Sequence, residues 1–112
     1  MSTYKKTPDR VLSSLGLAKR AGKVITGTEM VQDAVRSGKA LMVIAASDIS
    51  DNSRKKLTNT CAHYNTELFE YADMQMLSAA LGQKKLITSV AITDENFKIL
   101  IKIQLSGISE ND

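Results

Sequence analysis

Six consecutive apolar residues near the middle of the chain, Leu41 to Ala46 (LMVIAA), constrain the fold more than any other feature of the sequence. A strand with one face in water alternates apolar and polar side chains, and this run does not alternate. Such a run is typical of a strand that helices cover on both faces. The sequence therefore predicts an α/β protein in which this strand is buried between two layers of helices.

On both sides of this run, helical and strand-like spacings of apolar residues follow one another along the chain. Thr7 is expected to cap the first helix, and Gly22 is expected to end it. Further helices are predicted over Gly27 to Ser37, Asp51 to Tyr64 and about 73–82, and further strands over Val24 to Thr26, Glu67 to Tyr71 and Leu86 to Ile92.

The last segment, about 94–105, carries two competing periods. Ile101 and Leu105 share a helical period with Leu100 and a strand-like alternation with Ile103. We favour a helix, because four predicted strands already need one more covering element.

A chain of 112 residues is long enough to form one domain with its own core. We expect a single domain over 1–112, with an ordered core at about 8–105. Aromatic residues are only 4% of the chain, so aliphatic side chains must build that core. Met30, Tyr64 and Met76 are expected on inward faces. The predicted core comprises Leu15, Val31, Val35, Val43, Ile44, Leu57, Leu77, Leu81, Val90 and Ile92.

The sequence lacks the residue patterns of metal sites, cofactor sites and common catalytic centres. Cys61 and His63 are the only residues of their types, which is too few for a disulfide or a zinc site, and Cys61 is expected in the core. No phosphate-binding glycine loop or nucleophile elbow occurs, so we predict no catalytic residue, no metal, no cofactor and no enzyme activity. No apolar run approaches the ~18 residues of a membrane span, and no signal peptide opens the chain, so a cytoplasmic protein is expected.

Positive charge is concentrated in the N-terminal part, since residues 1–40 contain eight Lys or Arg and three Asp or Glu. Within this part, the stretch from Ala18 to Gly38 combines cations with a turn at Gly27 that starts a helix. A helix start presents free backbone N–H groups to an anion, and basic flanks strengthen such a site. The pattern favours a polyanion such as RNA. The alternative is an ordinary connecting turn with a solvated basic rim.

Several blocks of the sequence resemble one known family. In order, the blocks are LGLAKRAGKVITG, VRSGKA, LMVIAASDIS, CAHYN, LSAALGQKK and SVAITDENF. They are similar to the ribosomal protein L7Ae/L30e family, and most of all to its small bacterial YlxQ-like branch, over about residues 9–100. The resemblance implies a three-layer α/β/α sandwich around a mixed four-stranded sheet, a cytoplasmic setting, and binding to structured RNA such as the kink-turn.

In that family, RNA meets the start of the second helix and the loop before the last strand, which match Gly27 to Asp33 and Gln83 to Thr88 here. Kink-turn binders of the family carry Asn-Glu or Lys-Gln two and three places after the glycine, and a lysine further along. This chain has Glu29, Met30 and Asp33 at those places. We therefore expect weak binding to a generic kink-turn. The expected RNA-binding residues are Lys23, Gly27, Thr28, Glu29, Met30, Gln32, Arg36, Lys84, Lys85, Leu86 and Ile87.

The resemblance and the charge distribution together predict a non-enzymatic, monomeric RNA-binding protein. Its partner would be ribosomal RNA or the RNA of another ribonucleoprotein, and no membrane partner is expected. The alternative is a protein-interaction module that keeps this fold and has lost kink-turn binding.

Overall fold

The computed structural model describes residues 9–110, with only the backbone for residues 108–110. Four strands form one sheet in the order β2-β5-β3-β4. β3 pairs in parallel with β4, while β5 runs antiparallel to both β3 and β2, so the sheet is mixed. The strands are β2 (Val24–Thr26), β3 (Met42–Ala45), β4 (Glu67–Glu70) and β5 (Ser89–Ile92).

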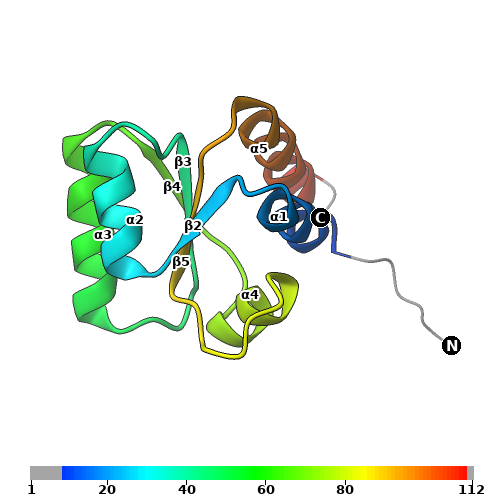
Figure 1. Cartoon of the computed structure of the whole chain (residues 1–112), viewed down its shortest axis with the longest axis horizontal. Coiled ribbons are helices and arrows are strands. Elements are labelled where there is room, and N and C mark those ends of the chain that lie inside the picture. Colours follow the sequence, from blue (N-terminus) through cyan, green and yellow to red (C-terminus); the bar gives the residue numbers. More distant parts are fainter. Residues whose placement is uncertain (1–8, 111–112) are drawn as a thin grey trace, which may run out of the picture.

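Five helices within the described residues cover the two faces of this sheet. In Figure 1, α2 and α3 lie together on one face, and α1, α4 and α5 lie on the other. This arrangement confirms the expected three-layer α/β/α sandwich. The helices are α1 (Arg10–Arg20), α2 (Thr28–Arg36), α3 (Asp51–His63), α4 (Met74–Ala80) and α5 (Glu95–Glu110).

The apolar run from Leu41 to Ala46 contains the interior strand β3, and all four residues of β3 are buried. β3 has a hydrogen-bonded neighbour on each side and a helical layer on each face, which explains the lack of polar alternation. All ten residues predicted for the core are buried, with at most 4% of their surface exposed. Cys61 is buried as expected, and its burial raises the pKa of the thiol.

The ends of the elements differ from the prediction in two places. Asp9 caps α1 by accepting a hydrogen bond from the Leu12 N–H, whereas the predicted cap, Thr7, lies outside the described residues. The predicted strand from Leu86 to Ile92 is wrong in its first half, because β5 begins only at Ser89. The Ile87 N–H is bonded to a serine hydroxyl on α4 and not to a neighbouring strand.

The last element is a helix, as favoured, and Asp94 caps it by accepting a hydrogen bond from the Phe97 N–H. Three inward placements were wrong: Met30 is 61% exposed, Tyr64 45% and Met76 44%. Met30 lies in the first turn of α2, and Tyr64 follows the end of α3, so neither is held between the helix and the sheet. Met76 borders a groove between α4 and α1.

Tyr71, which follows β4, is linked to the start of α1. Its hydroxyl donates a hydrogen bond of 2.5 Å to Oδ2 of Asp9. Burial, and then the hydrogen bond and the negative charge of Asp9, raise the pKa of Tyr71 to about 12. The contact therefore favours the neutral phenol in the folded protein.

This shift predicts a loss of stability at high pH. The pKa of Tyr71 is higher in the folded than in the unfolded chain, so its contribution is complete below pH 10.0 and is lost as the pH rises towards about 12. Unfolding by urea, measured on both sides of pH 10.0, should show this decline. The Tyr71→Phe variant should lack this component, and an equal decline in both proteins would contradict the assignment.

Candidate nucleic-acid interface

The start of α2 is built on a backbone conformation that favours glycine. Gly27 has φ 98° and ψ 146° and precedes the helix as its N-cap, where it provides no side chain to accept a hydrogen bond. Its own N–H donates to the Ser89 carbonyl at 3.1 Å, which ties the turn to the start of β5. The first turn of α2 is thus held at the end of the sheet without a side-chain cap.

The loop between α4 and β5 is held in place by one buried hydroxyl. Oγ of Ser78, on α4, accepts a hydrogen bond from the Ile87 N–H at 2.8 Å and lies 2.8 Å from the Lys85 carbonyl oxygen. This anchoring leaves Ile87 buried and turns Leu86 outward, with 60% of its surface exposed. Sequence reasoning missed Ser78. The sequence indicates its role only by a small hydroxyl side chain that follows Leu77, an inward residue of the predicted helix.

The structure brings these two segments, the start of α2 and the loop before β5, into contact. Oγ1 of Thr28, at the start of α2, lies 2.8 Å from Oγ1 of Thr88, at the end of the loop. Both segments lie at the lower end of the sheet in Figure 1. We call the resulting area the proximal surface. It comprises Gly27, Thr28, Glu29, Met30, Lys84, Lys85 and Leu86.

The proximal surface combines donors, cations and exposed apolar side chains. Met30 and Leu86 are each about three-fifths exposed. Lys84 and Lys85 are also exposed and form no ion pair with another described residue. Glu29 places a carboxylate in the first turn of α2, where the helix dipole favours it. Such a surface can meet phosphates, base edges and base faces at once.

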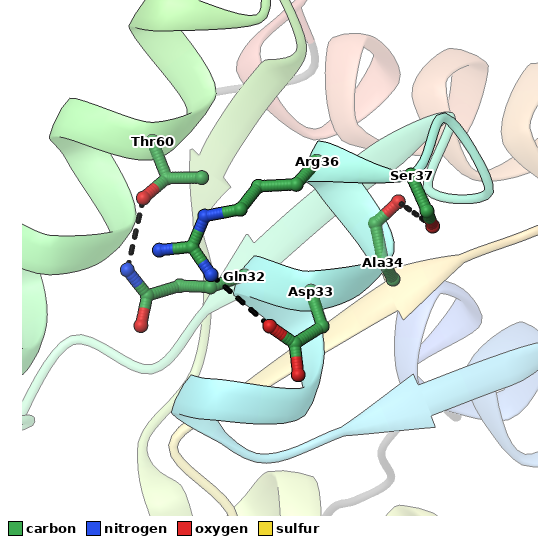
Figure 2. Close-up of polar contacts among 6 residues, drawn as sticks. All are labelled: Gln32, Asp33, Ala34, Arg36, Ser37 and Thr60. Atoms are coloured by element: carbon green, nitrogen blue, oxygen red, sulfur yellow. Dashed lines mark hydrogen bonds and ion pairs between the residues drawn. The ribbon is translucent and has the colours of Figure 1, made fainter.

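Two of the predicted cations lie away from this surface. Lys23 precedes β2 at the other end of the strand, where its carbonyl accepts a hydrogen bond from the Thr93 N–H. Arg36 is the last residue of α2, so the helical rise puts it ~12 Å from Thr28 along the axis. It pairs with Asp33 at 3.0 Å (Figure 2).

Gln32 points to the neighbouring helix and not to the proximal surface. Its Nε2 donates to Oγ1 of Thr60 on α3 at 2.9 Å, and only 9% of the residue is exposed (Figure 2). A buried amide without a partner would be costly, so this bond joins α2 to α3. Gln32 and Ile87 are therefore buried behind the proximal surface, where their hydrogen bonds hold α2 and the loop before β5 in position.

Two further observations concern other kinds of site. Among residues 9–110, no group of three or more His, Cys, Asp or Glu is placed to hold a metal ion. None of the helices in the described part of the chain is long and apolar enough to cross a membrane.

Gly27 also allows a test of the turn that positions α2. An added Cβ would meet no atom within 4 Å, so the cost of Gly27→Ala comes from the positive φ alone. We expect a loss of ~1–3 kcal/mol of unfolding free energy in urea titrations. Gly107→Ala is the matched control, because Gly107 lies within α5 with equal space around it and should gain up to ~1 kcal/mol from helix propensity. Equal stability of the two variants would contradict the conformational argument.

Comparison with known proteins agrees with this architecture. A sequence model of the Ribosomal protein L7Ae/L30e/S12e/Gadd45 family matches residues 9–101. A protein of Bacillus subtilis named "RNA-binding protein YlxQ" is 34% identical over 83 residues, which cover 74% of this chain and 82% of that protein. A protein of the same name from Enterococcus faecium is 31% identical over 98 residues, which cover 88% and 93% of the two chains.

Two solved structures share the fold. A protein of unknown function from Bacillus halodurans superposes with a TM-score of 0.84 at 31% identity, over 88% of this chain and 99% of the other. A Giardia lamblia 15.5kD RNA-binding protein has a TM-score of 0.73 at 16% identity, over 89% and 85% of the two chains. With the family match, the two bacterial relatives and the shared sandwich in agreement, the chain belongs to the ribosomal protein L7Ae/L30e family and resembles its YlxQ proteins.

Proposed function

We propose that this chain is a non-enzymatic RNA-binding protein that holds structured RNA on its proximal surface. The observation that supports this best is the junction of two distant segments by the Thr28–Thr88 and Gly27–Ser89 hydrogen bonds. The names of the two bacterial relatives point the same way. Cytoplasmic location, a monomeric state and a ribosomal or ribonucleoprotein partner belong to the same proposal.

Each group on the proximal surface has a defined part in this proposal. Backbone N–H groups in the first turn of α2 donate to a phosphate. Lys84 and Lys85 neutralise further phosphates and release counterions on binding. Met30 and Leu86 provide apolar contact for the faces of unpaired bases, in a protein with few aromatic rings for stacking.

Two side chains make a generic kink-turn a poor fit. Met30 cannot hydrogen-bond a guanine edge, and Asp33 places a carboxylate where kink-turn binders carry a lysine. Glu29 can still accept hydrogen bonds from guanine N–H groups. We therefore propose a structured RNA other than a simple kink-turn, with some preference for guanine.

The test compares two pairs of cations at opposite ends of the sheet. We expect Lys84→Glu with Lys85→Glu to weaken binding to transcripts that tile ribosomal RNA, and to reduce the salt dependence of log K by about 1 for each lysine that contacts a phosphate. The matched control is Lys23→Glu with Arg36→Glu, which reverses two exposed cations away from the proximal surface. The measurement is fluorescence anisotropy at several salt concentrations.

The outcomes separate the alternatives. Equal losses in the two double variants would show a diffuse electrostatic effect, and a loss only in the control would place the RNA at the other end of the sheet. Unchanged binding in the Lys84 and Lys85 variant would contradict the proposed surface. Absence of binding to every transcript by the unmodified protein would favour the alternative, a protein-interaction module on the same fold.

A further inference from the structure

A groove of about 710 Å³ runs between α1 and α4, on the face of the sheet opposite α2 and α3. Its floor is the contact between the two helices at Gly16, where an added Cβ would lie only 2.9 Å from the Ala80 carbonyl oxygen. Its sides carry Leu17, which is 50% exposed, and Met76, which is 44% exposed. Ala79 also borders it and is exposed. The groove is thus mostly apolar between its two ends and narrow at its floor.

The two ends of the groove carry opposite charges. The carboxylate at one end is already hydrogen-bonded, whereas the cation at the other end has no ion-pair partner among the described residues. At the start of α1, both carboxylate oxygens of Asp9 already accept hydrogen bonds, from the Leu12 N–H and the Tyr71 hydroxyl. At the end of α1, Arg20 borders the groove and forms no ion pair with another residue of the described chain. Its guanidinium lies 3.8 Å from the position of a Cβ on Gly16. At this end, a cation without an ion-pair partner among residues 9–110 lies beside the apolar floor.

We infer that this groove binds an amphipathic helix of a partner protein, with its apolar stripe between α1 and α4 and a carboxylate paired with Arg20. The length from Asp9 to Arg20 along α1 corresponds to ~16 Å, or about three turns of a bound helix. The small residues at the floor, Gly16 and Ala80, allow a close approach of that helix.

The surroundings favour a helix over other occupants. Two helices form the groove and no strand residue is among its described lining, so an extended peptide would find no sheet edge to pair its backbone N–H and C=O groups with. A helix satisfies these groups internally and needs only a groove for its apolar face. RNA fits poorly, because the described lining residues offer one cation and one acidic side chain against an apolar floor. The inference is thus independent of the RNA-binding proposal.

The test is a selection from a displayed library of amphipathic helices about three turns long. Ala79→Trp fills the groove from an exposed position, and Ala62→Trp, at an exposed position on α3, is the matched control. We expect enriched helices to share an apolar i, i+3, i+4, i+7 stripe and an acidic residue near one end. Their affinity should fall at least about tenfold in Ala79→Trp and stay unchanged in Ala62→Trp.

Charge reversal identifies the polar contact. Arg20→Glu should weaken the binding of the acidic helices and should select helices with lysine at the same place. Lys56→Glu, which reverses an exposed charge on α3, should have neither effect. Amide shifts in the unmodified protein provide a readout that does not depend on any variant. On addition of an enriched helix they should change at Leu17 and Ala79.

Several results would overturn the inference. The inference fails if the selection yields no helix that binds the unmodified protein better than Ala79→Trp. It also fails if the amide shifts are confined to other surfaces, or if the enriched helices carry no acidic residue. Two others would assign the groove to a different occupant: a dimer of this chain that Ala79→Trp dissociates, or a loss of RNA affinity in Ala79→Trp as large as that in the Lys84 and Lys85 variant.

Discussion

Ile44→Ala should lower the free energy of unfolding by ~2–5 kcal/mol, the usual range for removing most of a buried aliphatic side chain. Ile44 lies in β3 with none of its surface exposed. It pairs with Phe69 of β4 on one side and Val90 of β5 on the other, and helices cover both faces of the sheet. The strands hold their spacing through backbone hydrogen bonds, so we expect the surrounding residues to fill the cavity only in part. Urea titration followed by circular dichroism measures the loss.

The matched control for this prediction is Ile103→Ala on α5, where the same atoms are removed from a side chain that is 64% exposed. We expect that variant to change stability by less than about 0.5 kcal/mol, as is usual for surface substitutions. A loss below ~1 kcal/mol at Ile44 would contradict its place between two layers of helices.

Replacing Glu29 by Asn, Met30 by Glu and Asp33 by Lys should create or strengthen binding to a generic kink-turn. Each well-placed base contact is worth ~1–3 kcal/mol of discrimination. The three changes put a side chain that can hydrogen-bond a base edge in place of Met30, and a cation in place of Asp33. The structure makes the fold tolerant of these changes, because Met30 is 61% exposed and the Asp33 side chain is 70% exposed. The surface ion pair between Asp33 and Arg36 is lost and a like-charge pair replaces it, and each of these two effects is worth ~0.2–0.5 kcal/mol.

The assay titrates both proteins against a kink-turn and against a control RNA whose sheared G·A pairs are replaced by Watson–Crick pairs. The triple variant should bind the kink-turn more tightly than the unmodified protein, and the control RNA should not show this gain. A gain on both RNAs would show an effect of charge alone. Nanomolar, G·A-dependent binding by the unmodified protein would contradict the proposal and make the chain an ordinary kink-turn binder.

Much of the fold follows from patterns that are local in sequence. The unbroken apolar run around β3 predicted a covered strand, and helical spacing predicted the inward residues Leu57 and Leu77. The start of β5 could not be predicted in this way. Leu86 and Ile87 continue an apolar run that has the composition of a strand, but the Ile87 N–H bonds to Ser78 on another element.

The candidate interface was predictable as two segments, because the resemblance named the start of one helix and one loop. Their junction depends on the Thr28–Thr88 contact, which joins residues 60 positions apart. The basic stretch around Gly27 also suggested that Lys23 and Arg36 share this surface. The chain reverses direction between β2 and α2, however, so both lie towards the opposite end from Gly27.

The sequence by itself determined the layers, the buried strand and the residues of the core, because apolar periodicity reports which side of each element avoids water. Only the tertiary structure decided which polar groups meet: Gln32 with Thr60, Ser78 with Ile87, and Arg20 with an open apolar groove. These pairings join residues that lie far apart in the chain or on different elements. Hydrogen bonds act over about 3 Å, so no local pattern can indicate them until packing has set the elements side by side.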